Sequence, residues 1–352
     1  LKNTTTGSQN TASGAYSLSN TTSGNYNTAF GYSSALNNTI GTANTALGRT
    51  ALYSATTASS NTALGMEALY STTTGCENTA VGREALCANT GGLRNTAVGH
   101  RSLYKNTGSY NLGIGYAALY TNTSGAGNTA IGYASMYYST TSGYNSALGN
   151  GSLSKITTGC QNVAIGNLAL CSNTTACFNT AVGACSLMAN TTGADNTAVG
   201  ANALDANTTG SYNTAVGRVA LTQSTTGNFN TAVGRAALFH NTTGHSNTAS
   251  GYSALRLNTT ASYNTAFGRE TLYCNTTGDH NVAVGMQTSY CNCTGTHNTA
   301  MGNYALHYNC TGSCNTAVGY NALQKNQSGN VNTASGYQAL FCNTTGSGNN
   351  AM

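Results

Sequence analysis

The most distinctive chemistry in this sequence belongs to its twelve cysteines. Three pairs are separated by 17 residues: Cys160 with Cys177, Cys274 with Cys291, and Cys293 with Cys310. If residues at this interval lie on neighbouring β-strands, their Cα atoms are about 4.8 Å apart, a distance that a disulfide spans. We therefore predict three disulfides and an oxidising compartment; the alternative is that these positions simply tolerate a small side chain. Six cysteines have no partner at this spacing and are expected to be free, or to pair between columns or chains: Cys76, Cys87, Cys171, Cys185, Cys314 and Cys342.

Asparagines of Asn-x-Thr/Ser sequons recur at the same interval in the second half of the chain. They are Asn173, Asn190, Asn207, Asn241, Asn258, Asn275, Asn292, Asn309, Asn326 and Asn343. In a chain that enters a secretory pathway, such asparagines on surface loops would accept N-linked glycans. The alternative is turn chemistry, because Asn tolerates the left-handed conformation and Thr hydroxyls bond to nearby backbone.

Metal and catalytic sites are not indicated by the other reactive side chains. His280, His297 and Cys314 follow one another at 17-residue intervals, but a single-file column offers poor tetrahedral geometry for zinc. The seven acidic residues are scattered and form no carboxylate pair: Glu67, Glu77, Glu84, Asp195, Asp205, Glu270 and Asp279. We therefore expect no metal, no cofactor and no enzymatic activity.

The 17-residue interval belongs to a repeat with the consensus Asn-Thr-Ala-Val-Gly-x-x-Ala-Leu, followed by an Asn-Thr-Thr-Gly turn. Its first asparagine stands at positions 10, 27, 44, 61, 78, 95, 111, 128, 145, 162, 179, 196, 213, 230, 247, 264, 281, 298, 315, 332 and 349. One step, from Asn95 to Asn111, is 16 residues long because Asn106-Thr107-Gly108 lacks one Thr. A fixed period of this size is typical of repeat proteins. Residues 1–352 are thus one repeat array from Asn10 to Asn349, and we expect a fragment of a longer fibre because the chain begins and ends inside a unit.

We number the positions of each unit 1 to 17 from this asparagine. Position 3 is Ala in nearly every unit, position 5 is Gly in all twenty complete units, position 4 is mostly apolar and position 9 is usually Leu. Two short apolar segments, separated by Gly and by the polar turn, predict two strands and two turns per unit. The invariant Gly indicates a positive φ or a backbone too close to its neighbour for a Cβ.

A single unit is too small to fold alone. Burying its Val and Leu yields about 1.5–3 kcal/mol each, whereas fixing the backbone costs about 1–2 kcal/mol per residue. Stacking must supply the difference, through ladders of backbone hydrogen bonds and a continuous apolar column. The sequence therefore predicts an all-β protein: a parallel β-solenoid, or β-roll, of about twenty 17-residue turns, here called rungs, with a narrow alanine-lined interior.

Asn-Thr-Ala-Val-Gly-Tyr-Asn-Ala-Leu, from Asn315 to Leu323, resembles the Asn-Ser-x-Ala-Ile-Gly-x-x-Ala head repeat of trimeric autotransporter adhesins. Similar repeats occur in the fibres of phages and some large viruses, and the resemblance extends over almost the whole chain. It implies a left-handed β-roll, three chains packed side by side and a role in surface attachment. The adhesin repeat is shorter, and the additional residues here lie in the Asn-Thr-Thr-Gly turn. No anchor, stalk or coiled-coil heptad is present in these residues.

Composition narrows the classes of partner. Charged residues make up 5% of the chain, and the twelve basic residues behind its net charge of +5 are scattered, whereas a nucleic-acid binder clusters them. No run of about 18 apolar residues is present, so we expect no membrane insertion. Low complexity could indicate disorder, but disordered tracts have no reason to keep Ala, Val and Leu in fixed columns.

Position 6 is enriched in tyrosine and arginine, which protein interfaces favour. The predicted exposed stripe comprises Tyr32, Tyr116, Tyr133, Tyr252, Tyr320, Tyr337, Arg218 and Arg235. It would line a contact between subunits or meet a partner's glycans; the alternative is that Tyr merely suits a flat β surface.

These observations favour a non-enzymatic structural or adhesive fibre, located extracellularly, on a cell surface or on a virion. We expect self-association, as a homotrimer or a filament, with a host-surface glycan or protein as a further partner. Two alternatives are a self-assembling architectural filament and an ice-binding β-solenoid. The threonine pairs at positions 13 and 14 lie in a turn, which disfavours ice binding.

Overall fold

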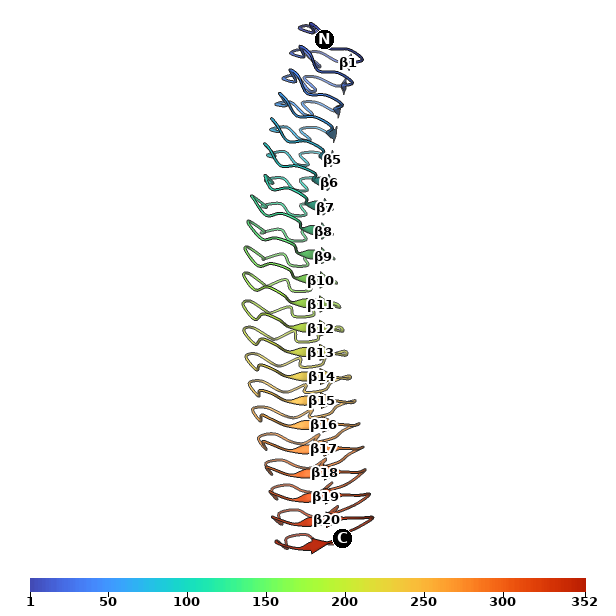
Figure 1. Cartoon of the computed structure of the whole chain (residues 1–352), viewed down its shortest axis with the longest axis vertical. Helices are drawn as coiled ribbons and strands as arrows, with labels where there is room; N and C mark the ends of the chain where they lie inside the picture. Colours follow the sequence, from blue (N-terminus) through green and yellow to red (C-terminus); the bar gives the residue numbers. More distant parts are fainter. The chain divides into compact units, whose positions relative to one another are not determined.

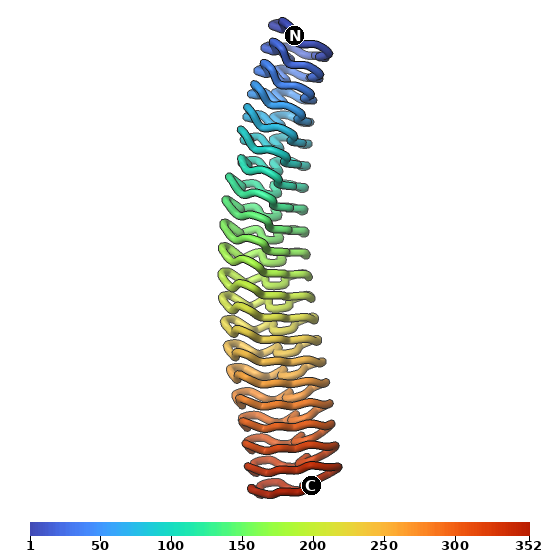
Figure 2. Tube along the Cα trace, viewed as in Figure 1, coloured from blue at the N-terminus to red at the C-terminus, as the bar shows by residue number.

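The computed structural model describes residues 1–352 and contains only strands and turns. No helix long and apolar enough to cross a membrane is present. The chain divides into two compact units, Leu1–Phe178 and Asn179–Met352. In each unit the chain winds once per repeat, so that short strands stack one above another (Figure 1) and the Cα trace forms a series of similar coils (Figure 2). The prediction of an all-β parallel solenoid is confirmed.

Each rung contributes one strand, at positions 2 to 4. The strands of the first unit are β1 (Thr11–Ser13), β2 (Thr28–Phe30), β3 (Thr45–Leu47), β4 (Thr62–Leu64), β5 (Thr79–Val81), β6 (Thr96–Val98), β7 (Leu112–Ile114), β8 (Thr129–Ile131), β9 (Ser146–Leu148) and β10 (Val163–Ile165). Those of the second unit are β11 (Thr180–Val182), β12 (Thr197–Val199), β13 (Thr214–Val216), β14 (Thr231–Val233), β15 (Thr248–Ser250), β16 (Thr265–Phe267), β17 (Val282–Val284), β18 (Thr299–Met301), β19 (Thr316–Val318), β20 (Thr333–Ser335) and β21 (Asn350–Ala351).

Within each unit, neighbouring strands pair in parallel and in register. Ala80 of β5 lies opposite Ala97 of β6, and Ala215 of β13 lies opposite Ala232 of β14. The short step between β6 and β7 preserves this register, because the missing Thr is removed from the turn and not from the strand. Identical side chains therefore form continuous columns along each unit.

The interior of each unit is lined by Ala at positions 3 and 8, as predicted, and by Leu at position 9; Ala80 and Leu86 are 0% exposed. Position 4, which we expected to be buried, instead points outward: Leu47 is 46% exposed and Val233 is 40% exposed. The reason is the two-residue period of a strand, which sends position 3 inward and positions 2 and 4 outward.

The predicted second strand, around positions 8 and 9, is wrong. Leu221 at position 9 has a φ of 51°, and such positive φ values recur at positions 7 and 9 of the other rungs. Within a rung, the N–H of Ala220 donates to the carbonyl of Gly217 at 3.2 Å, which closes a turn. This segment is therefore a chain of turns with its Leu inside. The left-handed conformation costs about 1–2 kcal/mol per residue, which burial of the leucine side chain offsets.

Both explanations offered for the invariant Gly at position 5 are confirmed. Gly217 has a φ of +137°, and a Cβ built on it would lie 2.6 Å from the carbonyl oxygen of Gly234 in the next rung. L-residues rarely adopt this conformation. The backbones of neighbouring rungs also approach too closely here for any side chain.

Most backbone N–H groups bond to a neighbouring rung. Thr214 donates to the carbonyl of Asn230 at 2.8 Å, and Leu221 donates to that of Ala237 at 3.0 Å. A buried backbone donor without a partner is costly. Stacking therefore provides hydrogen-bond partners for the backbone and also buries the apolar side chains. Each rung thus depends on its neighbours for stability.

Candidate functional site

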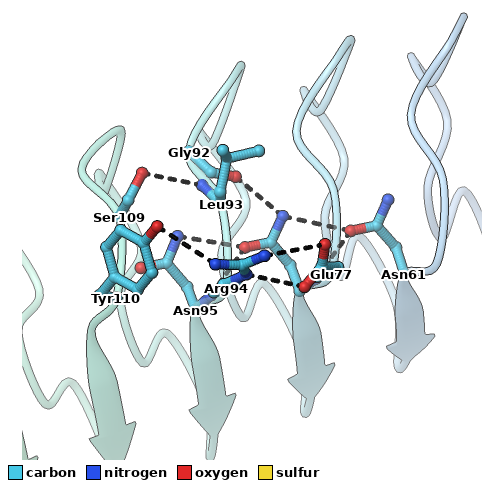
Figure 3. Close-up of polar contacts among 9 residues, drawn as sticks. Asn61, Glu77, Gly92, Leu93, Arg94, Asn95, Ser109 and Tyr110 are labelled. Carbon is cyan, nitrogen blue, oxygen red and sulfur yellow. Dashed lines mark hydrogen bonds and ion pairs between the residues drawn. The ribbon is translucent and has the colours of Figure 1, made fainter.

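The asparagines at position 1 form a buried ladder along the inside of each unit (Figure 3 shows it from Asn61 to Asn95). In the second unit, Oδ1 of Asn230 accepts from the backbone N–H of Asn247 at 3.0 Å and from its Nδ2 at 3.2 Å. The Nδ2 of Asn230 donates to Oδ1 of Asn213 at 3.2 Å and to the carbonyl of Gly244 at 2.8 Å. The side chain of Asn230 is thus bonded to the rungs on both sides and to its own turn.

A second ladder runs through position 12. The Nδ2 of Asn258 donates to Oδ1 of Asn241 at 2.8 Å and to the carbonyl of Ala261 at 2.9 Å. The position-1 residue Asn247 donates to the same carbonyl at 2.8 Å, so both ladders converge on position 15. Sequence reasoning missed the two ladders, although the presence of Asn at position 1 of every rung was a signal for them.

The predicted surface glycosylation sites are the asparagines of this second ladder, and their predicted exposure is wrong. Nine of the ten have an exposed fraction of 0%: Asn173, Asn190, Asn207, Asn241, Asn258, Asn275, Asn292, Asn309 and Asn326. Asn343 is half-buried. A glycan replaces one hydrogen of Nδ2, and residues such as Asn258 donate both hydrogens inside the core. Each of the ten donates to the carbonyl three residues later, as Asn207 does to Gly210 at 2.9 Å, and none of the ten has the left-handed conformation that the alternative invoked.

We expect glycan occupancy near zero at Asn207, Asn241 and Asn258 in folded protein secreted from a eukaryotic host. Glycopeptide mass spectrometry measures this directly. A matched control is Thr209→Asn, which removes the sequon at Asn207 and creates one two residues later on the exposed turn. This variant should be glycosylated at the new site. Occupied Asn258 in the folded fraction would contradict its burial.

Of the three predicted disulfides, Cys160–Cys177 is confirmed, with its Cα atoms 4.6 Å apart. Cys274, Cys291, Cys293 and Cys310 carry thiols in this structure and form one cluster over three rungs. The thiol of Cys293 donates to the backbone carbonyl of Cys291 at 3.3 Å, and no disulfide joins these four residues. The two predicted pairs are therefore neighbours that are not joined. The six cysteines outside the three pairs form no disulfide in the structure.

Burial changes the acidity of two thiols. It raises the pKa of Cys87 to about 11, with the negative charges of Glu67 and Glu84 acting in the same direction. Burial also raises the pKa of Cys274 to about 11, assisted by the neighbouring thiols of its cluster. Because the thiolate is the nucleophile, both groups are protected from alkylation at neutral pH.

Alkylation of Cys87 by iodoacetamide should therefore be slow at about pH 8 and accelerate by about tenfold per pH unit toward pH 11. The exposed Cys314 serves as the reference, and quantitative peptide mapping provides the rates. The folded state retains a proton that the unfolded thiol releases above about pH 9, so the free energy of unfolding should fall between about pH 9 and pH 11. Equal labelling rates for Cys87 and Cys314 at pH 8 would disprove this protection.

The predicted stripe at position 6 is exposed in both units. Its tyrosines have exposed fractions between 44% for Tyr252 and 73% for Tyr337, and Arg218 and Arg235 are also exposed. The guanidinium of Arg235 lies 5.7 Å from the ring centroid of Tyr252. Next to this stripe, position 4 forms the exposed apolar column described above.

Three of the acidic residues form ion pairs with arginine, which we had not predicted. Nε of Arg94 lies 2.8 Å from Oε2 of Glu77, and the same guanidinium donates to the hydroxyl of Tyr110 at 3.3 Å; Figure 3 shows both contacts as dashed lines. The hydrogen bond from Arg94 lowers the pKa of Glu77. Glu84 contacts Arg101 and Arg83, and Glu270 contacts Arg269. The ion pairs Arg94–Glu77 and Arg101–Glu84 each join two successive rungs, so these charges help to hold the stack together.

The histidine column is a stack of rings. His280 lies 4.9 Å from His297, with 1° between the planes, and Tyr263 stacks on the other side of His280. No group of three His, Cys, Asp or Glu side chains is arranged to hold a metal ion. A shallow depression of about 270 Å³ is lined by Tyr308, Lys325, Gln327 and Thr344, and Lys325 is its single charged side chain.

Comparison of the sequence with models of known protein families and with curated proteins finds no match. The side chains that the columns of this fold present to solvent are therefore the basis for inferring its function.

Proposed function

We propose that this chain is a non-enzymatic fibre protein whose copies associate side by side through the position-4 column. The observation that carries the proposal is the regular exposure of apolar side chains in that column. In the first unit Leu47 and Leu148 are 46% and 47% exposed, and in the second unit Val233 and Met301 are 40% and 46% exposed. Soluble monomers rarely expose contiguous apolar surface of this kind, which marks interaction sites.

A second copy of this chain is the partner that fits the column best. The column presents an apolar side chain in every rung except those of Ser13, Ser250 and Ser335, and neighbouring rungs are separated by 4.6 Å at the Cα atoms of Cys160 and Cys177. A partner with the same rung spacing can match the column over many rungs. The burial of apolar surface, which contributes about 25 cal/mol of free energy per Å², then adds up along the column. The tyrosines and arginines of position 6 border the column and suit the rim of such an interface.

The disulfide and the exposed tyrosines bear on where the protein is located and what it attaches to. The Cys160–Cys177 disulfide is typical of an oxidising environment, which supports an extracellular, cell-surface or virion fibre. We propose that position-6 tyrosines left uncovered by neighbouring chains contact a glycan or protein on a host surface. The same environment would oxidise the Cys274–Cys291 and Cys293–Cys310 thiol pairs.

Charge placed in the position-4 column should dissociate the assembly. We expect the unmodified chain to form oligomers in mass photometry, and a variant with Val199→Lys, Val216→Lys and Val233→Lys to be monomeric. The control carries Thr209→Lys, Thr226→Lys and Thr243→Lys, at exposed position 14 of the same rungs, and should assemble normally.

A monomeric unmodified chain at micromolar concentration would refute the proposal, as would a position-4 variant that assembles like the control. Negative-stain electron microscopy separates side-by-side assembly from an end-to-end filament, because the former makes the particles thicker and the latter makes them longer.

Ice binding remains a second candidate, because one observation favours it. The threonines at position 2 form an outward column in register, for example at Thr197, Thr214 and Thr231. The side chains beside them vary from Val233 to Phe267, which makes the surface uneven. A thermal hysteresis assay decides: no effect of the purified protein on ice growth removes this candidate.

A further inference from the structure

The tyrosines at position 10 stack along the axis of each unit. The ring centroids of Tyr104 and Tyr120 are 5.2 Å apart with 6° between the planes, and those of Tyr120 and Tyr137 are 5.0 Å apart with 8°. Tyr53 with Tyr70 and Tyr273 with Tyr290 have the same arrangement. Three tyrosine rings thus form one continuous stack between residues 104 and 137.

This arrangement places equivalent ring atoms of neighbouring tyrosines beside one another. Because the three rings are nearly parallel and about one rung apart, the ring carbons of Tyr120 lie between those of Tyr104 and Tyr137. All three rings are half-buried, so each has one edge in contact with solvent. Radicals formed on two such rings would be held 5.0–5.2 Å apart, measured between the ring centroids.

Stacking alone does not require tyrosine. An aromatic pair contributes about 0.5–1.5 kcal/mol beyond burial of its area, and Phe would provide the same contact. Position 10 contains Tyr seven times and Phe twice, at Phe239 and Phe341, which is close to the ratio in the whole chain, with its 22 Tyr and 6 Phe. The phenolic hydroxyl is what distinguishes the two residues, and it makes the ring oxidisable.

We propose that the stacked tyrosines are sites of oxidative cross-linking, at which a peroxidase-type oxidant and hydrogen peroxide join neighbouring rungs as dityrosine. Each of two phenols gives up one hydrogen atom, and the peroxide O–O bond is cleaved to yield two water molecules. The two phenoxyl radicals couple through the ring carbons next to their hydroxyls. Loss of the ring hydrogens to the oxygens restores both phenols, so the chain loses two hydrogen atoms in total.

The longest tyrosine stack lies in a segment without cysteine. Residues 95–144, which include Tyr104, Tyr120 and Tyr137, contain no cysteine. A dityrosine there would close a loop of one rung, as the Cys160–Cys177 disulfide does. Unlike that disulfide, it would survive reduction.

The test treats dilute full-length protein with peroxidase and hydrogen peroxide, followed by reduction, digestion and mass spectrometry. We expect Tyr104–Tyr120 or Tyr120–Tyr137 peptides that lack two hydrogen atoms, together with dityrosine fluorescence. Tyr120→Phe keeps the ring stack but should abolish both of these peptides, while the Tyr53–Tyr70 peptide persists. Tyr144→Phe, at an exposed tyrosine on which no ring stacks, should change neither product.

Two results would overturn the proposal: equal coupling at Tyr144, or wild-type protein that yields only singly oxidised tyrosines. Digesting only the monomer-mass band of a denaturing gel restricts the mapped cross-links to those within one chain, so neither result depends on whether the chains associate.

Discussion

Gly217→Val is expected to destabilise its unit by several kcal/mol, about 3 kcal/mol or more. The residue has a φ of +137°, and its Cβ would lie 2.6 Å from the carbonyl oxygen of Gly234 and 3.1 Å from the backbone N of Arg235. Backbone strain and a clash with the next rung therefore act together, and the clash involves backbone that no side-chain rotation can relieve. Denaturant unfolding followed by circular dichroism measures the loss.

Gly336→Val separates the two contributions. Gly336 has a nearly equal φ of +130°, but a Cβ at this position meets nothing within 4 Å. The variant should retain the strain without the clash and lose clearly less stability than Gly217→Val. An unchanged unfolding curve for Gly217→Val would contradict the placement of this turn, and equal losses would assign the whole effect to strain.

Asn230→Ala is expected to have a comparable effect through hydrogen bonds. It would leave the backbone N–H and Nδ2 of Asn247, Oδ1 of Asn213 and the carbonyl of Gly244 each without one partner. A buried polar group that loses its partner costs about 1–3 kcal/mol. Because some of these groups keep a second partner, we expect a loss of about 4 kcal/mol, measured as for Gly217→Val.

Asn241→Ala is the matched control in the same rung. Position 12 contains Ala55 and Ile156 in two other rungs, which shows that a rung tolerates the loss of this asparagine. We therefore expect at most half the effect of Asn230→Ala. Similar losses for the two variants would show that the position-1 ladder has no special role.

The period of the sequence was sufficient to predict the stacking but not the cross-section. A repeat of 17 residues places Ala80 over Ala97 in any solenoid with one rung per unit, so register followed directly. The period does not determine which residue of a three-residue strand faces the core, because Ala80 and Val81 are both apolar and either could be buried. The Ala-Leu segment was wrongly predicted as a strand, because its left-handed φ values occur at residues of many types and are not evident from the sequence.

The disulfide and the sequons illustrate why the site was predicted only in part. Cys160 and Cys177 were paired correctly because a covalent link depends on spacing, which the period provides. Asn207 was misplaced because Asn is common both in exposed turns and in buried hydrogen-bond ladders. Ala55 and Ile156 at the equivalent position were the available signal, since apolar substitutes indicate an interior column.

A cryo-electron microscopy map of the purified protein tests the central claim most directly, namely that each repeat is one rung of a parallel stack. We expect Ala215 directly over Ala232, one strand spacing of about 4.8 Å away, with Asn213 and Asn230 inside and Val216 and Val233 outside. A map in which Ala215 and Ala232 are not neighbours, or in which the position-4 side chains fill the interior, would contradict this claim.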